Sequence, residues 1–179
     1  MTTTWREEPH LSGPVAIRTT FLVGHPGESE AAFERLAEFV KQAEFDHMGA
    51  FTFSREEGTV AALLPNRVTA KVAKQRRTQL MRLQRAISRT KMKALVGKEL
   101  EVLVEGVSDE SEYLLQGRWA GQAPEIDGRV YLTDGTAQAG DLVRARITSF
   151  ADYDLAGEIV SVTKPRGGRV RATRLPVVA

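Results

Sequence analysis

The pattern of apolar positions in the first third of the chain predicts a strand–helix–strand unit. Residues 15–23 form a short apolar, β-rich run, which indicates a buried strand. A helix is expected next, because apolar side chains recur there at helical spacing: Phe33, Leu36, Ala37 and Val40. A second apolar run at 47–53 indicates another strand. Such units build parallel sheets and α/β barrels, and one unit alone lacks the rest of its sheet.

The next part of the chain predicts a long helix and then a small barrel. Residues 66–96 contain neither Gly nor Pro, Pro65 and Asn66 offer a start signal, and Gly97 offers a stop. One stripe of this helix is apolar: Val72, Leu80, Leu83, Ile87 and Ala94. Five short strands then follow, separated by glycine-containing turns, at 99–104, 113–119, 129–132, 142–147 and 155–160. Strands of this number and length are typical of a barrel of the oligonucleotide-binding type.

These elements predict an α/β plus all-β chain in five segments. An unstructured leader covers 1–14, an α/β segment 15–64, a long basic helix 65–96, a five-stranded barrel 97–161, and a disordered basic tail 162–179.

Charge is segregated along the chain, although the net charge is only +2. Residues 65–98 carry 11 bases and no acid, whereas 99–158 carry 13 acids and four bases. An acidic barrel is a poor match for a phosphate backbone, so its partner should be basic or uncharged. The basic helix has two interpretations, either an RNA-binding stripe or a solvated face that docks on the acidic barrel.

Candidate chemistry is limited by residue type. The chain has no cysteine, which excludes disulfides, thiolate zinc sites and cysteine-held iron–sulfur clusters, and its three histidines share no metal-binding spacing. With no signal-peptide core and no membrane-length apolar run, we expect a cytoplasmic protein. The turn Gly24-His25-Pro26-Gly27-Glu28 follows a strand and precedes a helix. It is either a cofactor-binding turn or a tight βα turn without a ligand.

Several strings resemble one family. Residues 18–29 and 49–59 resemble the late barrel strands and turns of the radical S-adenosylmethionine methylthiotransferases, and 76–84 resembles the helix that leaves their barrel. Residues 94–98 open a segment similar to that family's C-terminal TRAM domain. Residues 110–118 and 123–128 resemble the RimO-type branch, whose members add a methylthio group to an aspartate of a small-subunit ribosomal protein.

The resemblance implies a partial radical-SAM (β/α) barrel of two strands and two helices, followed by a five-stranded TRAM barrel. The family uses two 4Fe-4S clusters and S-adenosylmethionine, but its cluster cysteines are absent here. His25 and Phe53 also stand where the family usually has Phe and Tyr. No catalytic residue therefore carries over, and we expect this chain to hold no cofactor by itself and to be inactive alone. By resemblance, Leu22, Gly24 and Phe53 would remain as a wall of the S-adenosylmethionine pocket.

The resemblance also suggests a partner for the acidic barrel. A basic small-subunit ribosomal protein fits it by charge, and Glu125, Ile126 and Asp127 of the branch-specific loop are the predicted contacts. In this interpretation the TRAM domain supplies substrate recognition. The alternative is a stand-alone TRAM module that binds tRNA or rRNA, with RNA contacts from the basic helix and tail. No membrane partner is expected.

Overall fold

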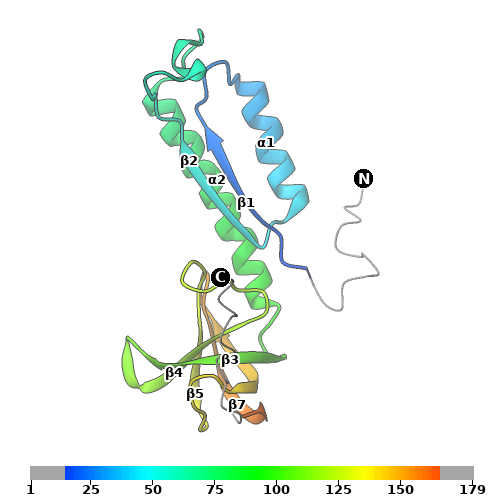
Figure 1. The fold of residues 1–179 in the computed structure, drawn as a ribbon. Helices are drawn as coiled ribbons and strands as arrows, with labels where there is room; N and C mark the ends of the chain where they lie inside the picture. The colour runs from blue at the N-terminus through cyan, green and yellow to red at the C-terminus, as the bar shows by residue number, and fades with distance from the viewer. Residues whose placement is uncertain (1–14, 166–179) are drawn as a thin grey trace, which may run out of the picture.

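The computed structural model describes residues 15–165, which form an α/β unit and a barrel joined by one long helix (Figure 1). The predicted leader and residues 166–179 of the predicted tail lie outside this described range. The elements run in the order β1 (Arg18–Val23), α1 (Glu30–Ala43), β2 (His47–Thr52), the 3-10 helix η2 (Val60–Leu63), α2 (Ala70–Lys93), β3 (Glu99–Ser108), β4 (Ser111–Trp119), β5 (Val130–Asp134), β6 (Leu142–Phe150) and β7 (Leu155–Lys164).

The strand–helix–strand prediction is confirmed. β1 and β2 are parallel, with Arg18 opposite His47 and Val23 opposite Thr52. Both helices cover one face of this two-stranded sheet, where Phe33, Val40 and Leu80 pack in a common core. The expectation of a buried first strand is wrong, because only Val23 of β1 is buried. Exposure alternates along β1, because no element of the described chain covers the opposite face.

Helix α2 differs from its prediction at both ends. It begins at Ala70, where the Thr69 side chain caps it by accepting from the Val72 N–H, rather than at Pro65 and Asn66. It ends at Lys93, and a turn follows before Gly97.

The buried stripe of α2 is also more polar than predicted. Leu80 is buried as expected, but Gln84 and Ser88 are buried beside it, while Leu83 and Ile87 pack only at the edge of the core. The buried amide has a structural role, because Gln84 Nε2 donates to the carbonyl of Phe45 at 2.9 Å. This hydrogen bond satisfies a backbone carbonyl just before β2.

The five barrel strands pair in the order β3-β4-β5-β7-β6, and β6 returns to β3 to close the sheet. Within the barrel, only the β5–β7 pair is parallel, and the other pairs are antiparallel. Strand β7 extends beyond the predicted end into the segment predicted as tail, because Lys164 pairs with Leu142 and the Thr163 hydroxyl donates to the Leu142 carbonyl.

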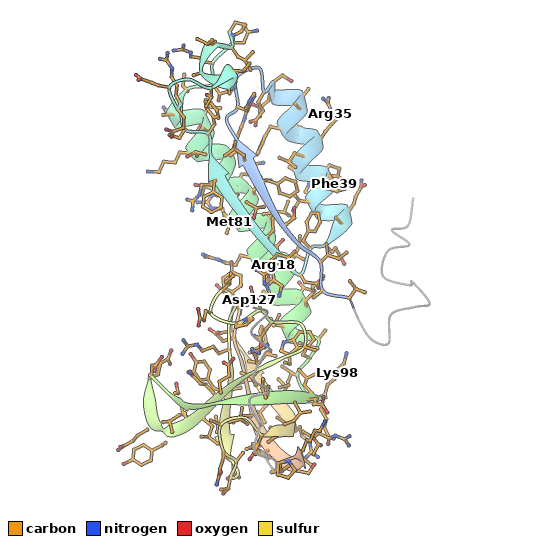
Figure 2. All side chains as sticks on the ribbon, viewed as in Figure 1. Arg18, Arg35, Phe39, Met81, Lys98 and Asp127 are labelled. Atoms are coloured by element: carbon orange, nitrogen blue, oxygen red, sulfur yellow. The ribbon has the colours of Figure 1, made fainter. Side chains whose placement is uncertain are left out.

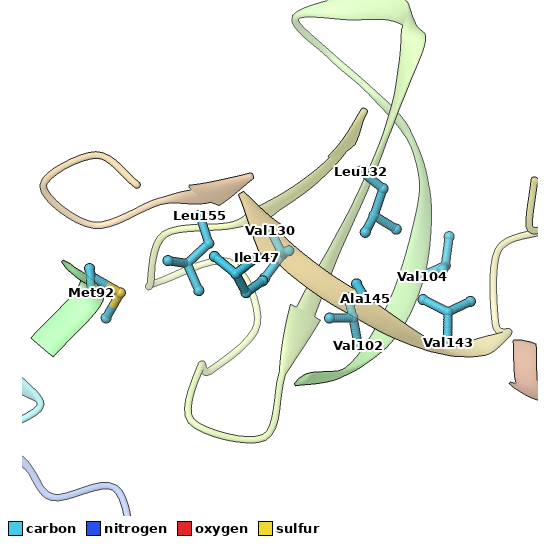
Figure 3. Packing of buried hydrophobic residues seen from close by; sticks show 9 residues of the cluster. All are labelled: Met92, Val102, Val104, Val130, Leu132, Val143, Ala145, Ile147 and Leu155. Carbon is cyan, nitrogen blue, oxygen red and sulfur yellow. The ribbon is translucent and has the colours of Figure 1, made fainter. Parts of the chain in front are cut away.

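The buried members of the barrel core are aliphatic apart from Met92, which comes from outside the barrel. Val102, Val143, Ile147 and Leu155 fill its interior, and Met92 of α2 closes one end (Figure 3). The long helix therefore belongs to both hydrophobic cores. Within residues 15–165, no helix has the length and apolar character needed to cross a membrane.

Candidate functional site

The turn at the carboxyl end of β1 folds around the carboxylate of Glu28. This carboxylate accepts from the Gly24 N–H at 2.9 Å and from Arg76 Nη1 at 2.6 Å. Arg76 also donates to the Glu28 carbonyl at 3.0 Å and to the Glu30 carboxylate at 2.8 Å. Glu28 precedes α1, and its side chain folds back toward the Gly24 N–H. The negative charge beside this turn is thus supplied by the chain itself.

Arg76 is buried, with its side chain only 7% exposed. Burial works against the positive charge, but hydrogen bonds to the carboxylates of Glu30 and Glu28 outweigh it and raise the pKa of the guanidinium. The Arg76–Glu28 pair therefore locks the start of α2 to the turn after β1.

Gly24 is required by packing as well as by backbone conformation. Its φ is +82°, and a Cβ at this position would lie 2.5 Å from the Cβ of Ala73 on α2. The tight-turn interpretation thus explains this glycine in full, without a ligand.

The three residues predicted to remain from a cofactor pocket do not all meet. Gly24 and Phe53 line a cavity of about 180 Å³ together with Arg55 and Ala73. Leu22 lies outside this lining, on the uncovered face of β1, and is 52% exposed. A cavity of this size is below the roughly 300–1,000 Å³ of small-molecule sites. Gly24 and Phe53 can therefore form part of a pocket wall, but they do not enclose a ligand.

Two contacts fix the position of Phe53. Its N–H donates to the Val23 carbonyl at 2.8 Å, and its ring meets the ring of His25 edge-on, with the centroids 5.3 Å apart. Within residues 15–165, no group of three or more His, Cys, Asp or Glu side chains is arranged so that it could hold a metal ion.

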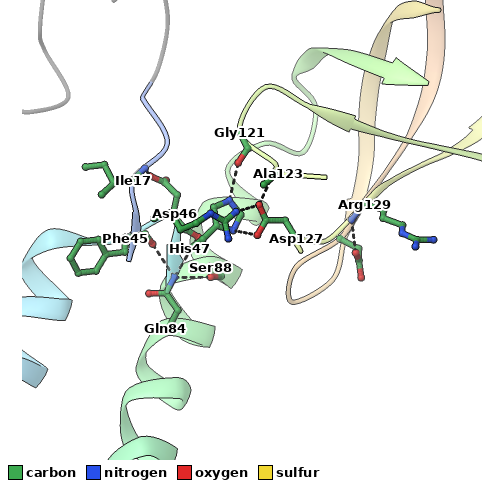
Figure 4. A network of polar contacts seen from close by, with 12 residues as sticks. Ile17, Phe45, Asp46, His47, Gln84, Ser88, Gly121, Ala123, Asp127 and Arg129 are labelled. Atoms are coloured by element: carbon green, nitrogen blue, oxygen red, sulfur yellow. Dashed lines mark hydrogen bonds and ion pairs between the residues drawn. The ribbon is translucent and has the colours of Figure 1, made fainter. Parts of the chain in front are cut away.

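The opposite, amino end of the two strands contacts the barrel through Asp127 (Figure 4). One carboxylate oxygen lies 3.0 Å from His47 Nδ1, and the other accepts from the Ala123 N–H at 2.7 Å and pairs with Arg18. His47 Nε2 lies 2.8 Å from the Gly121 carbonyl oxygen. Figure 2 shows Arg18 and Asp127 at this junction between the α/β unit and the barrel.

The three residues predicted to contact a partner divide into two groups. The Asp127 side chain is 4% exposed and is engaged by this chain's own His47 and Arg18. Glu125, at a φ of +63°, and Ile126, 75% exposed, project from the same loop toward solvent. Of the three, only Glu125 and Ile126 have side chains that are open to solvent.

The sequence did not predict that Arg18 and His47 contact Asp127. Arg18 lies 109 residues from Asp127, and Gly121 lies 74 residues from His47. No local pattern relates positions so far apart. The sequence offers one indication that this carboxylate is buried. Asp127 stands between Ile126 and Gly128, in a loop whose sequence otherwise indicates exposure.

The lower part of α2 docks on the barrel through Asp152. Arg89 Nη1 lies 3.1 Å from this carboxylate and Arg85 Nε 3.5 Å from it, and the Arg89 guanidinium stacks over Phe150. The docking interpretation of the basic helix therefore holds for these two arginines.

A second polar contact lies on the outside of the barrel. The Tyr131 hydroxyl donates to the Glu110 carboxylate at 2.8 Å. This hydrogen bond, together with partial burial and the negative charge nearby, raises the pKa of Tyr131 to about 12.

Comparison with known proteins finds similarity in both parts of the chain. Residues 96–160 match the TRAM domain family. The chain is 53% identical over 146 residues to a protein of Sorangium cellulosum named ribosomal protein uS12 methylthiotransferase RimO. Proteins of the same name from Geobacter sulfurreducens and an Anaeromyxobacter species are 50% and 47% identical, over 147 and 155 residues. The matches cover 82–87% of this chain but only 30–33% of those relatives, so the chain spans about a third of their length.

Proposed function

We propose, on the premise that this chain belongs to the RimO-type methylthiotransferase family, that it forms the C-terminal part of an enzyme that methylthiolates an aspartate of a small-subunit ribosomal protein. The identity of about 50% carries this proposal, because it extends over 146 residues, more than twice the length of the TRAM segment 96–160. The relationship therefore includes the α/β unit as well as the barrel.

We assign β1, α1, β2 and α2 to the wall of a radical-SAM (β/α) barrel. In such a barrel the helices cover the outer face of the sheet, and side chains from further strands fill the inner face. Here α1 and α2 cover one face, while Leu22 and Phe51 on the other face are 52% and 60% exposed. Parallel sheets are normally covered on both faces, so these exposed apolar side chains favour a barrel in which further strands cover them.

Within this proposal Gly24 and Phe53 contribute a wall of the S-adenosylmethionine pocket. They lie at the carboxyl ends of β1 and β2, the end of an α/β barrel at which ligands bind. The residues do not fit an iron–sulfur cluster, because the chain has no cysteine to ligate one. This chain therefore contributes binding surface, and the cluster chemistry belongs to other parts of the enzyme.

We assign recognition of the ribosomal protein to the TRAM barrel, through Glu125 and Ile126. The barrel's excess of carboxylates suits a basic partner. Ile126 lies beside Arg18 and His47 at the amino ends of the strands, whereas Gly24 and Phe53 lie at the carboxyl ends. Strands of six residues are about 20 Å long. The partner must therefore extend at least that far to reach both sites.

Binding of purified uS12 to the full chain tests this assignment. Replacing Glu125→Gln and Ile126→Ala together should weaken binding about tenfold, because the pair removes one charge and one exposed apolar contact. The matched control is Glu158→Gln with Val160→Ala, an acid and an exposed aliphatic residue on β7 of the same barrel. Equal losses of uS12 binding in both variants would contradict the assignment to Glu125 and Ile126. Binding of tRNA but not uS12 would contradict it too, and would favour the stand-alone RNA-binding module.

Anaerobic reconstitution of the chain with iron and sulfide tests whether the cluster chemistry lies in other parts of the enzyme. We expect no 4Fe-4S absorption and no cleavage of S-adenosylmethionine, since cysteine ligands are absent. A stoichiometric cluster with turnover would overturn the statement that the chemistry lies elsewhere.

A further inference from the structure

The outward face of α2 carries positive charge that the fold does not use. The helix holds nine Lys and Arg residues and no Asp or Glu. Five of the nine have a role within the chain: Arg76 binds Glu28, Arg77 donates to the Ala50 carbonyl, Arg85 and Arg89 meet Asp152, and Lys91 pairs with Asp46.

The remaining cations have no carboxylate partner among residues 15–165. They are three upper cations, Lys71 and Lys74 near the start of the helix and Arg82 at its middle, and a fourth, Lys93, next to the barrel. The three upper charges lie on one exposed face without a carboxylate partner in the described part of the chain, and such a face favours a negatively charged ligand.

The three upper cations form a row along the helix. Lys71, Lys74 and Arg82 are spaced by multiples of three and four residues together with Thr78, so the four side chains lie on one face. Eleven residues at a rise of ~1.5 Å each place Lys71 and Arg82 about 16 Å apart along the axis. A row of this length matches a run of several phosphates better than a single anion.

The side chains that accompany the cations favour a nucleic acid over an acidic protein. Gln75, Thr78 and Gln79 share this face, and amides and hydroxyls are common donors to phosphate oxygens. No large apolar side chain of α2 is exposed, whereas protein interfaces rely on apolar or aromatic anchors.

We infer that the face of α2 formed by Lys71, Lys74, Thr78 and Arg82 binds the sugar–phosphate backbone of RNA. The phosphate contact stands on the geometry alone. The choice of RNA over DNA rests on the proposed function, since a ribosomal protein as substrate brings ribosomal RNA close to the enzyme. The face lies on the α/β unit, apart from the TRAM loop assigned to the ribosomal protein.

The experiment measures binding of a fluorescein-labelled 12-nucleotide RNA to the full chain across a salt series, without uS12. Replacing Lys71→Gln, Lys74→Gln and Arg82→Gln together should weaken binding at least tenfold. It should also reduce the slope of log affinity against log salt by about two, at roughly 0.7 per phosphate contact.

The control removes the same charge from the barrel, with Arg118→Gln, Arg144→Gln and Arg146→Gln. These three arginines pair with Glu105 or Glu99, so we expect a change of less than about threefold. All variants keep the basic segment after residue 165, so its contribution is the same throughout. Thermal unfolding establishes that each variant is folded.

Three outcomes would overturn the inference. Equal losses in the two triple variants would make the effect one of net charge. Displacement of the RNA by polyglutamate at equal charge concentration would indicate a general polyanion surface, which includes acidic proteins. Equal affinity for DNA of the same sequence would show that the face does not prefer RNA over DNA. None of these measurements involves uS12, so the inference and the proposed function fail separately.

Discussion

His47 and Asp127 meet at the junction between the two parts of the molecule, with His47 Nδ1 3.0 Å from a carboxylate oxygen of Asp127. His47 begins β2, and Asp127 lies in the loop between β4 and β5. Because Asp127 is nearly inaccessible to solvent, this contact belongs to the interior of the junction and sets how the barrel abuts the sheet.

Asp127→Asn should loosen this junction. The amide cannot replace the charge that Arg18 and His47 contact, so we expect the free energy of unfolding to fall by about 1–3 kcal/mol. Small-angle scattering should also show a larger radius of gyration. The control is Asp109→Asn, an exposed carboxylate paired with Arg129, for which we expect less than ~0.5 kcal/mol. An unchanged unfolding free energy in Asp127→Asn would mean that the junction is held by other contacts.

Arg76→Met should be among the most damaging substitutions in the α/β unit. It leaves the carboxylate of Glu28 buried without its cation, for which the expected cost is about 3–5 kcal/mol. Adding Glu28→Gln should recover part of this loss, because the uncompensated charge is then removed. Urea unfolding measures Arg76→Met, Glu28→Gln and the double variant. A double variant whose loss equals the sum of the two single losses would argue against coupling between the two residues.

Gly24→Ala should destabilise the turn for two separable reasons, a φ of +82° and a clash with the Cβ of Ala73. We expect a loss of about 1–3 kcal/mol. Combining it with Ala73→Gly removes the clash but keeps the backbone strain, so rescue should be partial. Complete rescue, measured by thermal unfolding, would show that strain contributes nothing.

Tyr131 should titrate near pH 12, and Glu110→Gln should lower its pKa toward the ordinary value of about 10. A raised pKa means that the folded state holds this proton more tightly than the unfolded state. The contribution to stability is therefore complete below about pH 10 and is lost as pH rises toward 12. Difference absorbance of the tyrosinate between the chain and its Tyr131→Phe variant isolates this one phenol. A midpoint unchanged by Glu110→Gln would exclude the hydrogen bond as the cause.

Local sequence patterns predicted the elements of the fold well. The apolar spacing of α1 and the alternation in β3 reflect one buried face each, and such a face is visible in any short window. The ends of α2 were less predictable, because Thr69 rather than Pro65 supplies the cap. Its polar buried stripe was not predictable, since Gln84 is buried to meet a carbonyl 39 residues away.

The candidate sites were predictable only where they are local. The turn from Gly24 to Glu28 could be found by its glycines, but its ion pair with Arg76 depends on how α2 packs. In the loop before β5, the sequence marked Glu125, Ile126 and Asp127 together. Only the fold shows that Glu125 and Ile126 face solvent, whereas Asp127 contacts His47 at the junction between the barrel and the α/β unit. The predicted segment boundaries and the assigned contacts of Glu125 and Ile126 stay predictions.

Met92 has a practical consequence for anyone who prepares the barrel as an isolated fragment. The TRAM match begins at residue 96, and a fragment cut there would lack the side chain that closes one end of the barrel core. The same helix carries Leu80 into the core of the α/β unit, so loss of either core removes support from the other. The two halves should therefore melt in a single transition, and a stable barrel fragment should begin no later than the last turns of α2.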